Sequence, residues 1–95
     1  MGEEMTSGSD LALKYDQRAD VLYVRVGEPV PADVDEDDAG LLVRFAKETG
    51  EACGVTVLGF ASTWELEIDR LADLLEGHLH IPAGDVARAL ASVAR

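Results

Sequence analysis

The chain has 95 residues, of which 47% are hydrophobic, and a formal net charge of −11 at pH 7. This length supports one hydrophobic core, and the composition is typical of a folded globular domain rather than a disordered chain. A chain with this much negative charge repels phosphate backbones, which argues against direct nucleic-acid binding. The charge favours either high solubility or a basic protein partner. Cys53 is the only cysteine and the apolar runs are too short to cross a membrane, so we expect a cytoplasmic protein.

The first part of the chain predicts a tail followed by a hairpin. Residues 1–10 are polar and lack periodicity, so we expect a disordered tail before a single domain over 11–95. Alternation of apolar and polar residues predicts strands over 11–15 and 21–26. Between them, 16–20 holds no strand former and predicts a tight turn.

The middle of the chain predicts a loop and a second pair of strands. Two prolines and a run of acids over 27–40 predict a long loop, because proline donates no ladder hydrogen bond and carboxylates need water. Strands are predicted over 41–46 and 52–60, joined by a turn in which Gly50 adopts the left-handed conformation.

The C-terminal third predicts two helices. Ser62 and Glu65 have the S-x-x-E spacing of a capping box, so a helix is expected over 63–76, with Gly77 as its stop. Its apolar stripe consists of Trp64, Ile68, Leu71 and Leu75. Residues 78–81 are expected to be extended, and a second helix follows over 82–94, with Pro82 at its first position.

Together these elements predict an α+β fold, an antiparallel four-stranded β-meander packed on one face by a C-terminal helix, with a second short helix at the C-terminus. The helix-covered face is expected to hold Leu22, Val24, Leu41, Val43, Phe45, Val55 and Val57. The opposite face then presents a mixed apolar and basic surface, which is our candidate interface: Tyr23, Arg25, Leu42, Arg44, Leu58 and Phe60, with Thr56 among them. We expect a twofold homodimer through this face or the C-terminal helix. The alternative is that the second helix folds over it.

The segments 15–26 and 41–60 carry a recognisable pattern, YDQRADVLYVRV followed by LLVRFAKETGEACGVTVLGF. Its marks are Tyr15, Asp16, Ala19, Asp20, Leu22 and Tyr23, followed by Gly50, Gly54 and Val55. This pattern resembles the small prokaryotic family catalogued as domain of unknown function 2283, over about 11–62. The resemblance implies a β-meander followed by a helix and no established catalytic activity, and some members look like partners of small toxin-like proteins encoded beside them. It also suggests that 64–95, which the shortest members lack, binds this chain's own partner.

Two groups of residues offer a metal-binding alternative. The acidic run consists of Asp33, Asp35, Glu36, Asp37 and Asp38. It fails the EF-hand template, because the required glycine falls on Asp38 and the closing glutamate on Arg44, although a weaker divalent site remains open. His78 and His80 would share one face of an extended segment and could give a transition metal two ligands.

The sequence gives less support to a catalytic site. Cys53 has no basic neighbour in the sequence to activate it, and combining Ser62, His78 and Asp85 into a triad lacks a nucleophile elbow. Tyr15 and Asp20 are interpreted as stabilising the first turn.

We therefore expect a non-enzymatic protein-interaction or oligomerisation module, a homodimer that could also act as an antitoxin-like partner of a basic toxin. No cofactor is expected. The alternative is a divalent-metal-binding protein or small enzyme that uses the 33–38 acidic loop or the His78 and His80 pair.

Overall fold

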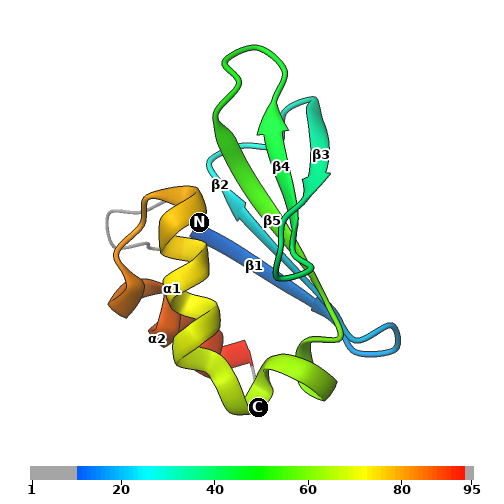
Figure 1. The fold of residues 1–95 in the computed structure, drawn as a ribbon, viewed down its shortest axis with the longest axis vertical. Helices are drawn as coiled ribbons and strands as arrows, with labels where there is room; N and C mark the ends of the chain where they lie inside the picture. The colour runs from blue at the N-terminus through cyan, green and yellow to red at the C-terminus, as the bar shows by residue number, and fades with distance from the viewer. Residues whose placement is uncertain (1–10, 94–95) are drawn as a thin grey trace, which may run out of the picture.

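The computed structural model describes residues 11–93, so the predicted tail and Ala94, the predicted end of the second helix, lie outside the described residues. Five antiparallel strands form one sheet in the order β1-β2-β5-β4-β3. The strands are β1 (Leu11–Asp16), β2 (Val21–Val26), β3 (Ala32–Glu36), β4 (Leu42–Ala46) and β5 (Ala52–Leu58). Helices α1 (Ile68–Leu79) and α2 (Ala83–Val93) lie together on one side of this sheet (Figure 1). The predicted α+β class is confirmed.

One strand lies in the segment predicted to be a long loop. β3 pairs with β4 at the edge of the sheet, so the prediction of four strands is wrong. The edge position explains the error, because an edge strand leaves one side of its backbone unpaired and can keep its carboxylates in water. Lys47, in the turn after β4, supports this edge: its Nζ donates to Asp33 Oδ1 at 2.7 Å and its backbone N to Pro31 O at 3.0 Å.

The sheet is not the predicted meander, because β5 lies between β2 and β4. β5 is the longest strand, and its Val55 and Val57 are fully buried. The central position gives hydrogen-bond partners to both sides of this most buried backbone, which an edge position would not. The sequence alternation reports which face a residue occupies but not the order of the strands.

The helix-covered face agrees with the prediction, with one irregularity. Its buried residues are Leu22, Val24, Leu41, Val43, Val55 and Val57. A β-bulge between Arg44 and Phe45 interrupts the pairing of β4 with β5, and Phe45 is only half-buried beside the core.

The helical layer begins later than the capping-box spacing predicts. A π-helical turn (Phe60–Trp64) and a 3₁₀ turn (Glu65–Glu67) precede α1. The Ser62 hydroxyl donates to Gly59 O at 3.4 Å, and the residues that precede the two turns and α1 make no side-chain capping hydrogen bond. The predicted box is therefore wrong, and its helix start at 63 is replaced by a start at Ile68.

Helix α1 also ends later than predicted. It continues through Gly77 to Leu79, and His80 then adopts the left-handed conformation with φ 61°. The His80 N–H donates to Glu76 O at 2.8 Å, which closes the last turn two residues before Pro82. The expected extended segment over 78–81 is wrong, because its first two residues belong to the helix.

The two helices share the core with the sheet. Leu71 and Leu75 of α1 and Val86 and Leu90 of α2 are fully buried in one cluster with the strand residues. Helix α2 packs against α1 and β1, so the alternative in which the second helix covers the opposite sheet face is wrong. No helix within 11–93 combines the length and hydrophobicity that a membrane span requires.

The Asp20 side chain joins the first hairpin to the start of the helical layer. Asp20 ends the turn between β1 and β2 in the left-handed conformation, with φ 56°. Its Oδ1 accepts hydrogen bonds from the Tyr15 hydroxyl at 2.6 Å and from Ala61 N at 2.7 Å, and its Oδ2 accepts one from Ser62 N at 3.1 Å. One carboxylate therefore satisfies amides that a capping box would otherwise have to satisfy.

The Asp20 backbone strengthens the same junction. Its carbonyl oxygen accepts hydrogen bonds from Gly59 N at 2.8 Å and Phe60 N at 3.1 Å. The rings of Tyr15 and Phe60 meet edge to face, with centroids 5.6 Å apart. The hydrogen bond from Tyr15, followed by that from Ala61, lowers the pKa of Asp20 from 3.8 to about 2.

Replacing Asp20 with asparagine should remove the charge while keeping a residue that tolerates positive φ. Because the folded-state pKa lies below the unfolded one, the ionised carboxylate stabilises the fold above pH 3.8, and this contribution is lost as the pH falls through about 2. We expect Asp20→Asn to lower the thermal midpoint at neutral pH, and the gap from the unsubstituted chain to close toward pH 2. Thermal unfolding followed by circular dichroism measures this gap.

The matched control is Asp73→Asn, since Asp73 is an exposed residue of α1. An equal midpoint for Asp20→Asn and the unsubstituted chain at neutral pH would contradict the assignment of Asp20 as the junction.

Candidate functional site

The candidate site lies on the sheet face opposite the helices, which we call the outer face. Strand pairing aligns its outward residues in two rows that cross the sheet. The first row consists of Lys14, Tyr23, Thr56, Leu42 and Glu36. The second row consists of Ala12, Arg25, Gly54, Arg44 and Val34. The sequence alternation therefore placed Tyr23, Arg25, Leu42, Arg44 and Leu58 on one face, as the register has them.

Apolar side chains are exposed toward one end of the outer face. Tyr23 is 45% exposed and Leu58 is 51% exposed, and Leu42 is half-buried between their strands and β3. Phe60 does not belong to this group, because it is only 1% exposed. Its placement in the candidate interface is wrong: Gly59, with φ 67°, ends the strand alternation and turns Phe60 into the core.

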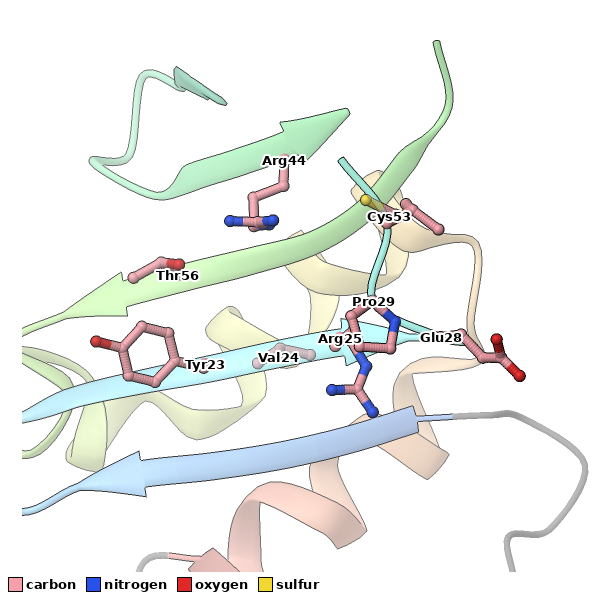
Figure 2. Close-up of a pocket in the computed structure, with 9 residues that line it drawn as sticks. Tyr23, Val24, Arg25, Glu28, Pro29, Arg44, Cys53 and Thr56 are labelled. Carbon is pink, nitrogen blue, oxygen red and sulfur yellow. The ribbon is translucent and has the colours of Figure 1, made fainter. Parts of the chain in front are cut away.

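A hollow of about 190 Å³ lies beside this apolar end (Figure 2). Its lining residues come from β2, β4, β5 and the loop after β2, and they are Tyr23, Val24, Arg25, Glu28, Pro29, Val30, Arg44, Cys53 and Thr56. The loop segment 28–30 forms one wall, which sequence reasoning missed, because a loop's path over a sheet leaves no periodic signal.

Arg44 and Arg25 stand on either side of Gly54 in the second row. A Cβ atom at Gly54 would lie 2.7 Å from Val24 O, so the close approach of β2 and β5 excludes a side chain from this position. The stem of Arg44 occupies part of the space, with its Cδ 3.6 Å from that Cβ position. Figure 2 shows the Arg44 guanidinium lying over β5, between Thr56 and Cys53.

The loop after β2 holds Arg25 on the other side of the hollow. Its Nε donates to Gly27 O at 2.8 Å, which turns the guanidinium toward the β1 side of the sheet (Figure 2). The terminal nitrogens of Arg25 and the whole guanidinium of Arg44 have no carboxylate partner within 11–93. Glu28 lines the hollow, but its carboxylate points away from Arg44 and Thr56 (Figure 2).

The residues considered as metal ligands are not brought together. Within the described part of the chain, no three His, Cys, Asp or Glu side chains group as metal ligands. Asp33 pairs with Lys47, while Asp37 faces His78. The shared face proposed for His78 and His80 is wrong, because the first lies in α1 and the second is its left-handed cap.

The pair of Asp37 and His78 fastens the turn between β3 and β4 to the end of α1. His78 Nε2 lies 2.8 Å from Asp37 Oδ2, and Asp37 Oδ1 accepts hydrogen bonds from Ala39 N at 2.9 Å and Leu41 N at 2.8 Å. Burial opposes ionisation of Asp37, but the hydrogen bonds from His78, Leu41 and Ala39 outweigh it and hold its pKa below 3.8. This contact joins residues 41 positions apart in the sequence, so no local pattern predicts it.

The residues weighed as a catalytic triad have other partners. His78 faces Asp37, Asp85 pairs with Arg88 at 3.5 Å, and the Ser62 hydroxyl donates to Gly59 O. Cys53 is half-buried and lines the hollow on the outer face, a position that the sequence analysis did not predict.

Comparison with known proteins identifies the family. A family model described as protein of unknown function (DUF2283) matches residues 12–60. The chain belongs to this family. No curated protein and no solved structure matches the sequence. The DUF2283 match covers the sheet and stops where the helical layer begins.

The geometry gives the DUF2283-like residues of the first hairpin a structural role. Asp16 Oδ1 accepts hydrogen bonds from Arg18 N at 3.1 Å and Ala19 N at 3.2 Å, which closes the turn. Tyr15 and Asp20 then connect that turn to Phe60 and the residues after it. These residues fix the fold of the sheet and its junction with the helices.

Removing either member of the Asp37 and His78 pair should destabilise the protein. Their side chains are 19% and 27% exposed, so truncation leaves a partly buried polar group unsatisfied, and we expect His78→Ala to cost about 1 kcal/mol. Asp37→Ala should cost more, because the Ala39 and Leu41 amides also lose their acceptor. Urea unfolding of both single variants and the double variant measures these values.

The double variant should be less destabilised than the sum of the single variants, by about 0.5–1 kcal/mol of coupling. Asp73→Ala, on an exposed position of the same helix, is the control and should be near neutral. Full additivity would show that the two side chains do not stabilise each other.

Proposed function

We propose that this chain is a non-enzymatic protein-interaction module that forms a twofold homodimer through the outer face of its sheet. The proposal assigns no reaction to it and places it in the cytoplasm, as its single cysteine favours. The supporting observation is the apolar end of the outer face, where Tyr23, Leu42 and Leu58 lie on a surface that neither helix covers. Apolar groups gathered on an open sheet face are typical of an interface.

The outer face carries few acids, which supports a second copy as the occupant. Two chains with a net charge of −11 repel each other at long range, so association is least opposed at a face with few acids. Across β1, β2, β5 and β4, the two rows contain no carboxylate and three cations, Lys14, Arg25 and Arg44. The next row, which consists of Asp16, Val21 and Leu58, contains one acid. A cyclic dimer is also the commonest closed assembly, and it would bury the same apolar end on both copies.

Replacing Leu58 with glutamine should weaken the dimer without adding charge. Each copy loses one buried apolar side chain, so we expect the dimer dissociation constant to rise by about 10- to 100-fold. The matched control is Leu66→Gln, since Leu66 is 96% exposed in the 3₁₀ turn and lies outside the sheet. Analytical ultracentrifugation of the two variants and the unsubstituted chain measures the constants.

Salt provides a second readout of the same proposal. Screening reduces the repulsion between two acidic chains, so the dimer should become tighter as sodium chloride is raised. A monomer at every accessible concentration and salt level would refute the homodimer, as would equal constants for the Leu58 and Leu66 variants.

An antitoxin-like role with a basic partner is a second candidate, which the edge strand β3 favours. Asp35 and Glu36 are exposed there and make no ion pair within 11–93.

A complex of this kind should weaken with salt, whereas the homodimer should tighten. Co-purification with the product of an adjacent gene, with Asp35→Asn and Glu36→Gln as a combined variant, tests it. Recovery of no basic protein would count against this candidate.

A further inference from the structure

We propose that the hollow on the outer face is a binding site for an oxyanion, the phosphate or carboxylate group of a small molecule. This inference goes beyond the homodimer, because it assigns a ligand to the arginine row, which we define as Arg25, Gly54 and Arg44.

Arg44 supplies the main contact. Its guanidinium lies over β5 with no hydrogen bond or ion pair to another described residue, so its nitrogen donors face solvent at the hollow. A guanidinium presents parallel N–H groups that match the two oxygens of a carboxylate or phosphate. The hydroxyl of Thr56, in the adjacent outward row of the sheet, lies beside it as a further donor (Figure 2).

Arg25 adds positive charge from the opposite side. Neighbouring strands lie about 4.8 Å apart, so the backbones of Arg25 and Arg44, on either side of β5, are separated by about 10 Å. Gly54 keeps the floor between them free of a side chain, and the contact of a Cβ atom with Val24 O would prevent one. The bond from Arg25 Nε to Gly27 O holds its stem while leaving the terminal nitrogens for a ligand.

The size of the hollow restricts the ligand. Its volume of about 190 Å³ falls below the range of about 300–1,000 Å³ that holds drug-sized ligands. One phosphate or carboxylate group can therefore fit in the hollow beside the Arg44 guanidinium.

Two of the unpaired basic residues meet at the hollow. Lys47, Arg70 and Arg88 each pair with a carboxylate, whereas Lys14, Arg18, Arg25 and Arg44 have no such pair within 11–93, and of these four Arg25 and Arg44 line the hollow. In a chain with 19 acidic residues against 8 basic ones, two neighbouring arginines that no acid neutralises form a local exception. At physiological salt the screening length is about 8 Å, so acids elsewhere on the surface weaken the attraction of a contacting anion only slightly.

NMR titration of the full chain tests the proposal. Sodium phosphate and sodium acetate are added separately at constant ionic strength, with sodium chloride as the reference, and shifts are followed at the Gly54 and Thr56 amides and the Arg44 Nε–H. We expect saturable shifts at these groups with a dissociation constant on the order of 1 mM. Phosphate and acetate then show which oxyanion the site prefers.

Variants of the arginines separate the site from general attraction. Arg44→Gln should weaken binding by about tenfold. Arg44→Lys keeps the charge without the planar guanidinium, so its affinity should lie between those of Arg44→Gln and the unsubstituted chain. Arg25→Gln should have a smaller effect, because part of its guanidinium already bonds to the loop. Arg88→Gln on α2 is the matched control and should leave binding unchanged.

The same titration on Leu58→Gln distinguishes this proposal from the homodimer. Retained binding in that variant supports a site that is complete in one chain, whatever the dimer constant. Equal affinity of Arg44→Gln and the unsubstituted chain would overturn the proposal, as would shifts that never saturate or that chloride reproduces. Since the Arg44 side chain is exposed, its variants should keep the folded spectrum, and their thermal midpoints verify this.

Discussion

The carboxylate of Asp20 is the constraint on which the relation between sheet and helices depends. It stands at the end of the first turn, yet the amides it accepts belong to residues about forty positions later in the chain. Through these bonds the exit from the central strand is fixed against the first hairpin, and the π-helical turn starts in a defined direction. The helices then reach only one side of the sheet, which leaves the outer face open. The open outer face of the sheet thus follows from the junction that Asp20 makes with the start of the helical layer.

The residues that mark the family fall into two groups, those that hold the fold together and those, such as Tyr23 and Gly54, that lie on the outer face. The residues that mark the first hairpin, Tyr15, Asp16 and Asp20, form hydrogen bonds within the fold and have little left to offer a ligand. The exposed apolar and basic side chains lie on the same strands but point the other way. Membership of DUF2283 therefore identifies the scaffold of this chain, and the two binding surfaces that we propose lie on the outer face of that scaffold.

The sequence predicted the elements whose signal is local. Alternation in 21–26 and 41–46 placed Tyr23, Arg25 and Arg44 on one face, because the pleat makes side-chain direction a matter of parity. It could not place β5 between β2 and β4, since strand order depends on how the completed sheet buries its most apolar strand. The capping box did not form for a related reason. The carboxylate of Asp20, in a distant turn, accepts the hydrogen bonds of the Ala61 and Ser62 amides at the start of the helical layer. Phe60 was misplaced because one left-handed glycine ended the alternation that had been extended through it. The hollow could not be predicted, because it depends on the path of the loop after β2 and on the close approach of β2 and β5 at Gly54. Neither leaves a pattern in the sequence.

The acidic edge of the sheet has a consequence for how these chains can meet. β3 offers an unpaired row of backbone groups, and unpaired edges invite copies to add strand upon strand without limit. Its Asp35 and Glu36 are exposed and make no ion pair within 11–93, so two β3 edges that met would bring like charges together. Pairing of β3 with β3 is thereby disfavoured. The acids that first suggested a metal site thus limit how this edge of the sheet can pair.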